Sequence, residues 1–336
     1  MHPPTFQQLV LNSARRLALP ISTYPALWIT GAKVSDIVTN PRAQFEAQSA
    51  LRKRFGSPFA LAAMDLSAEA EAFGCTVAIS DAEIPTVTGR LVTNIEQAKA
   101  LAVPQPGDKR TSVYIEAVQL LRSLEGEPFV FGGCIGPFSL AARLVGVSEA
   151  LELTLAEPEL MHVLLEKSSQ FLAGYINAFR AAGARGVIMA EPAAGLLSPR
   201  GMSKFSSAYI RQIFAELNEP SFTLLLHNCG AKLLHLPAIL ETGLNTFHFG
   251  APMDLVGALK QVPPDTIICG NLDPAGVFVQ SSPAEVAKRT AQLLSDTAAL
   301  RNYVISSGCD VPPNAPLTNL EAFYQAVHAA NAPAHP

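Results

Sequence analysis

The sequence predicts an α/β protein built as one (β/α)8 (TIM) barrel, and three observations carry this prediction. Short apolar runs alternate with segments of helical periodicity along the 336 residues. The runs are almost continuously apolar, as the strands of a parallel sheet covered on both faces must be. Polar and metal-capable side chains follow the ends of these runs, where such barrels carry their functional sites.

The predicted strands are eight in number and five to seven residues long. They lie at residues 25–29, 58–64, 128–133, 186–190, 222–226, 245–249, 266–270 and 303–307. A doubly wound open sheet is the alternative, but it requires a glycine-rich phosphate loop after its first strand. The first predicted strand is followed by Thr-Gly-Ala-Lys at residues 30–33, which is a poor match to such a loop.

Helical segments precede and separate these strands. An N-terminal helical extension is predicted over residues 5–17, where apolar residues recur at helical spacing. Further helices are predicted at residues 41–55, 69–74, 111–124, 159–182, 198–217, 283–298 and 316–331. Residues 75–79 and 84–91 alternate with a period of two, so we expect a β-hairpin inserted over the mouth of the barrel.

The composition indicates a single folded domain over residues 1–336. Hydrophobic residues make up 49% of the chain and charged residues 15%, which supplies a large core and argues against disorder. The 26 Pro and 22 Gly are scattered as turn residues and form no linker. We therefore expect one barrel domain without a boundary inside it.

Charge, targeting signals and cysteine content limit the partners and the cell compartment that we expect. A net charge of -4 leaves no polybasic face, so nucleic acid and membrane are not expected partners. No window approaches 18 uninterrupted apolar residues, and the N-terminus lacks the pattern of a signal peptide. Five widely spaced cysteines do not form a disulfide framework. We expect a cytoplasmic protein with reduced thiols.

Two stretches end in side chains suited to zinc. Residues 224–230 read Leu-Leu-Leu-His-Asn-Cys-Gly, and residues 305–310 read Ile-Ser-Ser-Gly-Cys-Asp. We interpret His227, Cys229 and Cys309 as one zinc site at the carboxyl ends of two strands. Three protein ligands leave tetrahedral zinc a fourth position for water or substrate, and an open position indicates catalysis.

A structural interpretation competes with the zinc site. Cysteine is among the most buried residue types, so Cys229 and Cys309 can be core thiols beside a hydrogen-bonded interior histidine. Glycine and polar residues flank both cysteines, which places them where strands become loops and favours a site. A purely structural zinc site would need a fourth fixed protein ligand.

Five stretches resemble the uroporphyrinogen decarboxylase superfamily. They are LLLHNCG, TIICGNLDP and VISSGCDVPPNAPLTNLEAF, with MDLSAEAEAFGC and IMAEPAAGLLSP upstream. The His-x-Cys pair with Cys309 inside Ser-Gly-Cys-Asp-Val-Pro-Pro is similar to the zinc motif of the superfamily's corrinoid methyltransferase branch, the methylcobamide:thiol and methoxyarene:corrinoid enzymes. The resemblance implies a (β/α)8 barrel, zinc, and a corrinoid carried by a partner protein.

The resemblance also implies an activity and its competitors. It implies a zinc-dependent methyltransferase that moves a methyl group between a corrinoid protein and a small-molecule thiol or methoxylated substrate. The superfamily's decarboxylases use an arginine-rich motif after a tryptophan, whereas Trp28 is followed here by Ile-Thr-Gly-Ala-Lys without arginine. Uroporphyrinogen decarboxylase is therefore the runner-up. A non-catalytic zinc- or corrinoid-binding homologue is the third possibility.

Four further strand-end residues are candidates for the site. We expect catalytic roles for Glu191, as fourth zinc ligand or proton acceptor, and for Asp65, in substrate binding. A carboxylate bound at the barrel rim and a turn cap are their respective structural alternatives. We expect Asn271 and Asp273 to orient the cofactor or to cap the next helix. His248 is more simply interpreted as a satisfied core histidine.

The carrier protein should dock against the open mouth of the barrel. The predicted docking loops follow the third and fourth strands, where Ile135, Phe138, Leu196 and Leu197 place apolar side chains near the expected metal. Ordinary packing of these residues at the barrel rim is the alternative.

Overall fold

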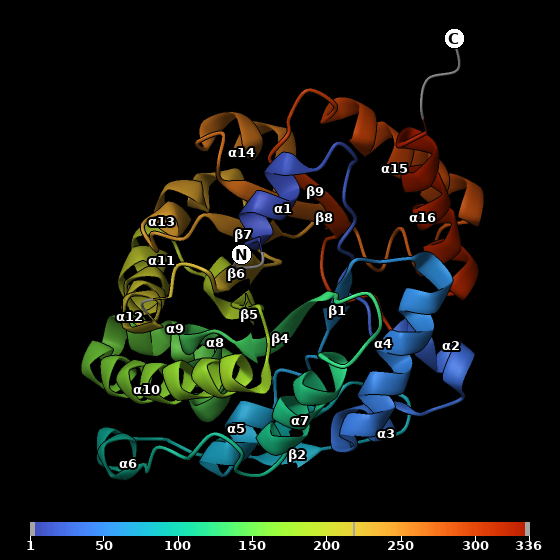
Figure 1. Cartoon of the computed structure of the whole chain (residues 1–336). Coiled ribbons are helices and arrows are strands. Elements are labelled where there is room, and N and C mark those ends of the chain that lie inside the picture. The colour runs from blue at the N-terminus through green and yellow to red at the C-terminus, as the bar shows by residue number, and fades with distance from the viewer. Residues whose placement is uncertain (1–3, 218, 333–336) are drawn as a thin grey trace.

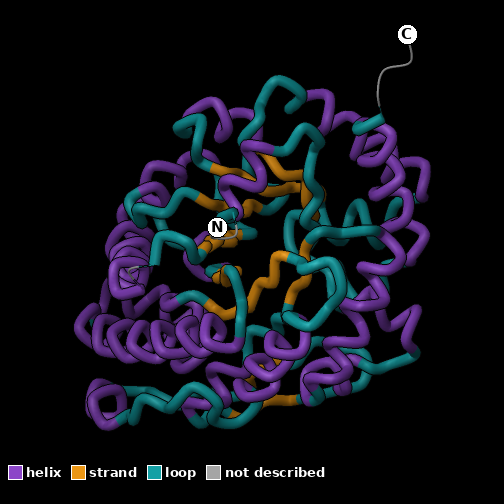
Figure 2. Tube along the Cα trace, in the orientation of Figure 1, coloured by secondary structure: helices purple, strands orange, loops and turns teal. Residues whose placement is uncertain are grey.

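The computed structural model describes residues 4–217 and 219–332, and a curled parallel sheet surrounded by helices forms its framework (Figure 1). Within these residues, seven strands pair in the order β1-β4-β5-β6-β7-β8-β9, all parallel. They are β1 Phe59–Leu61, β4 Phe129–Ile135, β5 Gly186–Ala190, β6 Thr223–Asn228, β7 Thr246–Phe249, β8 Ile267–Leu272 and β9 Tyr303–Ser307. Figure 2 shows these strands at the centre and the helices around them. The predicted α/β barrel class is confirmed.

An extended segment at residues 17–21 takes the remaining place in the ring, between β9 and β1. It runs beside β9, where Leu19 N donates to Ile305 O at 2.9 Å and Ile305 N to Leu17 O at 3.1 Å. On the β1 side, the buried amide of Gln48 donates to Ser22 O at 3.0 Å and accepts from Leu61 N at 3.2 Å. A side chain thus satisfies backbone groups where the two segments do not pair directly.

The prediction of a buried strand at residues 25–29 is wrong. These residues form the short helices η1 Tyr24–Ala26 and α2 Leu27–Thr30, and the side chain of Trp28 is 61% exposed. Pro25 lies in the first turn of η1, where its fixed φ favours a helix start. The predicted opening helix is also shorter than expected, because α1 ends at Asn12 and the chain then extends along β9.

Helices cover the outside of the sheet. The longer ones are α1 Phe6–Asn12, α4 Pro41–Phe55, α7 Thr111–Leu121, α8 Pro137–Val145, α9 Val147–Ala156, α10 Pro158–Ala182, α12 Ala208–Leu217, α14 Leu255–Gln261, α15 Pro283–Asp296 and α16 Leu317–Ala330. Shorter ones are α3 Val34–Thr39, α5 Ala68–Phe73, α6 Ile95–Ala100, η2 Pro192–Leu196, α11 Pro199–Met202, η3 Ser203–Ser207, η4 Leu233–His235 and α13 Leu236–Leu240. None of the described helices combines the length and apolarity that crossing a membrane requires.

The predicted hairpin is present, whereas the helix predicted over residues 198–217 is interrupted. The expected hairpin exists as β2 Thr76–Ala78 and β3 Thr86–Thr88, which pair antiparallel. The helix expected over residues 198–217 begins at its predicted cap, with Ser198 Oγ accepting from Gly201 N at 3.1 Å. It is interrupted by the wider turn η3 between α11 and α12, so it is not one continuous helix.

Two apolar layers hold the barrel together. One lies inside the ring and includes Phe59, Phe131, Leu225 and Val304, with Phe6 of α1 packed edge-on against Phe131 at 5.4 Å between ring centroids. The other lies between the sheet and the outer helices. Because side chains alternate along a strand, Leu225 of β6 points inward, and so does His227, two residues closer to the carboxyl end. The barrel interior is thus apolar around Leu225 and becomes polar at the carboxyl ends of the strands.

Candidate metal centre

His227, Cys229 and Cys309 come together at the carboxyl ends of β6 and β9. Their ligand atoms, one from each side chain, all lie within 4.8 Å of one another. His227 is the second-last residue of β6, and Cys229 follows that strand directly. Cys309 lies two residues beyond β9. Residues 80 positions apart in the chain are therefore brought within reach of one metal ion.

The chemistry of this cluster fits zinc. His227 Nε2 is buried and has no hydrogen-bond partner among the described residues, which is unfavourable unless another group takes its lone pair. One imidazole and two thiolates are ligands that zinc prefers, and a set of three leaves a coordination position open. The predicted ligands thus have both the proximity and the unsatisfied nitrogen that a metal site requires.

The two thiols influence each other's protonation. A hydrogen bond from Cys309 lowers the pKa of Cys229, and the neighbouring His227 lowers it further although burial opposes the shift. The same contact and burial raise the pKa of Cys309. The two thiols therefore share a proton through their contact, and a cation bound by both sulfur atoms would replace it.

A cavity of about 330 Å³ opens beside the cluster. His227, Cys229 and Cys309 lie on its wall, and residues 84–86, just before and at the start of β3, cover it. The hairpin insertion therefore lies over the mouth of the barrel, as predicted. Arg143 of α8 and Asp310 also line the cavity, and Asp310 Oδ1 is buried without a hydrogen-bond partner among the described residues.

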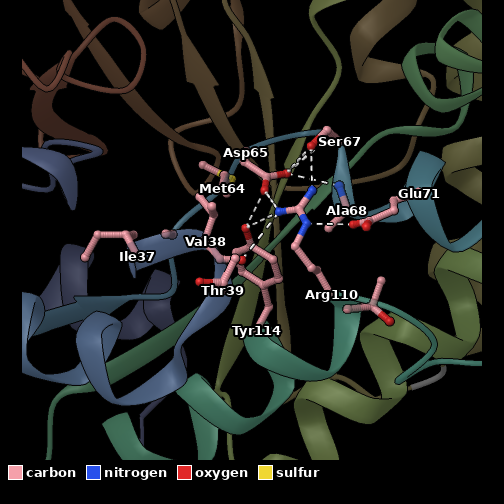
Figure 3. Close-up of polar contacts among 12 residues, drawn as sticks. Ile37, Val38, Thr39, Met64, Asp65, Ser67, Ala68, Glu71, Arg110 and Tyr114 are labelled. Carbon is pink, nitrogen blue, oxygen red and sulfur yellow. Dashed lines mark hydrogen bonds and ion pairs between the residues drawn. The ribbon is translucent and has the colours of Figure 1, made fainter. Parts of the chain in front are cut away.

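Asp65 lines this cavity, but its carboxylate is fully engaged (Figure 3). Oδ1 accepts from Ser67 N at 2.8 Å and Ala68 N at 3.0 Å, and Oδ2 accepts from Tyr114 Oη at 2.6 Å. Arg110 forms an ion pair with the same carboxylate and reaches Glu71 at 2.6 Å on its other side. The turn-cap interpretation therefore describes the contacts of Asp65, and its role toward substrate remains a prediction.

Glu191 follows β5 directly, and its side chain turns toward the N-terminus of α8. Its carboxylate accepts from Phe138 N at 2.8 Å, Ser139 N at 2.9 Å and Ser206 Oγ at 2.9 Å. Burial raises the pKa of Glu191, and these hydrogen bonds oppose the shift. Its oxygens are not part of the three-residue cluster, so a role as fourth ligand would require a different side-chain orientation.

Asn271 and Asp273 form local contacts at the end of β8. Asn271 Nδ2 donates to Gly250 O at 3.1 Å and Met253 O at 2.9 Å, which fastens β8 to the loop after β7. Asp273 Oδ1 accepts from Ala275 N and Gly276 N, both at 3.0 Å, and so caps the following turn. Neither is among the described residues that line the cavity, and their cofactor role remains a prediction.

Two residues around the cluster, Ser306 and Gly250, were missed from the sequence. His248 is buried and hydrogen-bonded at both ring nitrogens, as the interpretation of a satisfied core histidine expects, and it links His227 to Ser306. Gly250 packs against the backbone of Cys229. The period-two alternation of β9 points Ser306 inward, so that residue could have been found from the sequence. The close approach of Gly250 depends on two loops and has no signal in sequence.

The predicted docking residues differ in exposure. Ile135, Phe138 and Leu197 are buried, so packing and not docking describes them. Leu196 is 61% exposed and lies beside Leu155 of α9, which is 88% exposed. The two leucines line a second cavity of about 480 Å³, together with Arg200 and Lys204.

Fold and site together define the class of protein: a TIM-barrel-like α/β protein with an imidazole and two thiols gathered at the carboxyl ends of its strands. The chain belongs to the uroporphyrinogen decarboxylase family, since the family description "Uroporphyrinogen decarboxylase (URO-D)" matches residues 20–330.

Relatives of two kinds have similar identity to this chain. A methylcobamide:CoM methyltransferase, MtbA, from Methanosarcina acetivorans is 29% identical over 261 residues, covering 76% of this chain and 75% of that protein. A uroporphyrinogen decarboxylase from Psychromonas ingrahamii is 27% identical over 295 residues, covering 84% and 82%. A solved methyltransferase structure from Methanosarcina mazei superposes with a TM-score of 0.87 at 20% identity, covering 98% of this chain and 100% of that one. That structural likeness supports the fold.

Proposed function

We propose that this protein is a zinc-dependent methyltransferase that moves a methyl group between a corrinoid protein and a small-molecule thiol or methoxylated substrate. The observation that carries the proposal is the His227, Cys229 and Cys309 cluster on the wall of a cavity, together with an imidazole nitrogen that has no hydrogen-bond partner among the described residues. The similarity to MtbA supports the same activity.

We assign separate roles to the ligand residues and to the residues that line the cavity. His227, Cys229 and Cys309 would hold zinc, which when bound supplies the Lewis acidity that turns a thiol into a thiolate or polarises an ether oxygen. The cavity volume is that of a small-molecule site. Ile84 and Pro85 contribute apolar side chains to the cavity wall.

Decarboxylation of uroporphyrinogen is the second candidate, because decarboxylases are among the similar proteins. A substrate with many carboxylates needs several fixed guanidinium partners. Arg143 is the one arginine among the described residues that line the cavity. Purified protein should therefore give no coproporphyrinogen from uroporphyrinogen, and measurable product in that assay would replace our proposal with decarboxylation.

Methyl transfer is tested with free methylcobalamin as a stand-in for the corrinoid protein. Zinc-loaded protein is mixed with a panel of small thiols, and loss of the methyl-cobalt absorption is followed together with thioether formation; the reverse direction is tested with methoxylated aromatics and reduced cobalamin. We expect turnover with at least one class, abolished in Cys309→Ser. Folded protein that holds substoichiometric zinc and turns over neither class would instead favour a non-catalytic homologue.

A further inference from the structure

A chain of three hydrogen bonds runs from His227 across the top of the barrel interior. His227 Nδ1 lies 2.8 Å from His248 Nδ1, and His248 Nε2 lies 2.8 Å from Ser306 Oγ. Ser306 Oγ in turn lies 2.6 Å from Leu19 O. The chain crosses β6, β7, β9 and the extended segment at residues 17–21, and all four residues are buried.

The carbonyl at the far end fixes the direction of every bond in this chain. Leu19 O can only accept, so Ser306 must give its single hydroxyl proton to that carbonyl. Ser306 Oγ is then left as an acceptor toward His248, whose Nε2 must carry the proton of the second bond. His248 is therefore protonated at Nε2.

The direction of the hydrogen bond between His227 and His248 follows from the burial of His248. Its side chain is 0% exposed, and the side chains that its two ring nitrogens contact are those of a histidine and a serine, with backbone groups of His248 and Ser307 close by. A charged imidazolium without a carboxylate partner is unfavourable in such a place, so the ring is neutral and its Nδ1 is an acceptor. His227 Nδ1 must then donate, which leaves the lone pair of His227 on Nε2.

The lack of a hydrogen-bond partner at His227 Nε2, within the described part of the chain, agrees with this tautomer. His227 Nε2 is one of the buried side-chain atoms that have no hydrogen-bond partner among the described residues, and His227 belongs to the three-residue cluster. With the opposite tautomer, a proton would occupy the position where a metal ion must bind, and it would have to leave first.

We propose that His248 and Ser306 are positioning residues that hold His227 in its Nδ1-protonated tautomer, so that Nε2 is ready to bind metal before the metal arrives. The inference rests on the proposed zinc site. It concerns the metal-free protein and zinc affinity, so it can fail or hold independently of methyl transfer.

The tautomers can be read directly by nitrogen-15 NMR of the imidazole rings in metal-free protein. We expect His227 to be protonated at Nδ1 and His248 at Nε2. His235 is an internal reference for the second tautomer, because its Nδ1 accepts from Lys232 N at 3.0 Å and its Nε2 lies 3.2 Å from Leu197 O. A proton on Nε2 of His227 in the wild-type protein would overturn the proposal.

Ser306→Ala tests the device without touching a metal ligand. Removing the hydroxyl frees the tautomer of His248, so we expect zinc affinity to fall tenfold or more, roughly the loss seen when the hydrogen-bond partner of a ligating histidine is removed. Thr246→Val is the matched control, since Thr246 Oγ1 also donates to a buried carbonyl, Leu224 O at 2.7 Å, outside the chain. Equal zinc affinity in both folded variants would contradict the proposal.

A second variant guards against loss of fold in Ser306→Ala. His248→Leu removes the acceptor of His227 and fills the space with an apolar side chain. We expect the cobalt-substituted variant to retain thiolate-to-cobalt absorption from Cys229 and Cys309. Its visible bands should shift, because His227 is no longer held as a ligand. Wild-type bands and wild-type zinc affinity in this variant would show that His248 does not position the ligand.

Discussion

At the scale of single residues, the two cysteines of the cluster differ from the other cysteines. Cys229 and Cys309 are part-buried at a cavity wall, whereas Cys75, Cys134 and Cys269 are buried. Burial alone raises the pKa of Cys269, and burial raises that of Cys75 to about 11. Burial raises the pKa of Cys309 too, but there a second thiol shares the proton. Exposure to a cavity and mutual contact distinguish the proposed ligand pair.

Cys229→Ser and Cys309→Ser should each lose most of the bound zinc. A neutral hydroxyl is a far weaker zinc ligand than a thiolate, and two remaining ligands do not hold the ion tightly. Metal analysis of purified protein measures the effect, with Cys75→Ser as the control at a thiol outside the cluster. Circular dichroism should show a folded barrel in all three. Zinc at one ion per chain in both cluster variants would refute the site.

Gly250→Ala should weaken zinc binding from outside the ligand set. A Cβ at Gly250 would lie 2.1 Å from Cys229 O and 2.7 Å from Cys229 Cα, so the loop carrying Cys229 must move. We expect a loss of about 1–3 kcal/mol in stability, the usual cost of overpacking, together with weaker zinc binding. Denaturant unfolding and a competitive chelator assay measure the two effects.

Gly243→Ala is the control for that substitution. Gly243 has φ +76° and open space around its Cβ position, so alanine there strains the backbone without pushing on the cluster. It should lower stability and leave zinc affinity unchanged. If the two alanine variants lose zinc equally, the spacing set by Gly250 is not what positions Cys229.

At the scale of elements, α5 carries a buried carboxyl group below the cavity. Glu69 accepts from Ile135 N at 2.9 Å, and burial raises its pKa to about 7. The hydrogen bond and Arg110 oppose this shift, while Asp65 adds to it. Because the folded-state pKa exceeds the ordinary value of 4.5, the folded protein binds this proton more tightly than the unfolded chain.

Stability should therefore fall as the pH rises from about 4.5 through 7. Glu69→Gln keeps an acceptor for Ile135 N but cannot ionise, so it should escape this loss. Relative to wild type, we expect the variant to gain about 2 kcal/mol between pH 5 and pH 8, measured by denaturant unfolding. Glu116→Gln, at an exposed position of α7, is the control. A pH-independent difference between Glu69→Gln and wild type would contradict the assignment.

At the scale of the whole molecule, the proposed function needs a surface that docks a corrinoid protein, and the exposed leucines of α9 and η2 are our candidates for it. Leu155 and Leu196 line one cavity near the barrel mouth, beside the basic residues Arg200 and Lys204. Transient interfaces are small, on the order of 1,200 Å² or less, so single apolar contacts matter in them.

Replacing Leu155 and Leu196 together with Asp should abolish methyl transfer from the carrier protein and spare transfer from free methylcobalamin. Phe214→Asp, at a half-exposed apolar position of α12, is the control for an added surface charge. The two methyl donors are compared at equal concentration in one assay. If both donors fail with the double variant, the leucines support the fold or the cavity, and the docking surface lies elsewhere.

Features that depend on neighbouring residues could be predicted from the sequence alone. Apolar runs, helical spacing and the Ser198 cap predicted most strands and helix starts, because these patterns act over a few residues. The residue types His and Cys at strand ends predicted which side chains would gather in one cluster at the carboxyl ends of β6 and β9. The strand at residues 25–29 was wrong because an apolar run containing Pro25 fits a short helix equally well.

The contacts of each polar group depend on how distant parts of the chain pack together. Asp65 pairs with Arg110 and Glu191 caps α8, through partners 45 and 52 to 53 positions away. The tautomer of His227 depends on Leu19, whose carbonyl meets Ser306 across 287 positions of sequence. The fold must close before that carbonyl can orient the hydroxyl, the two imidazoles and finally the nitrogen that faces the metal site. Proton placement at the centre is therefore a property of the closed barrel, because no local pattern of residues encodes it.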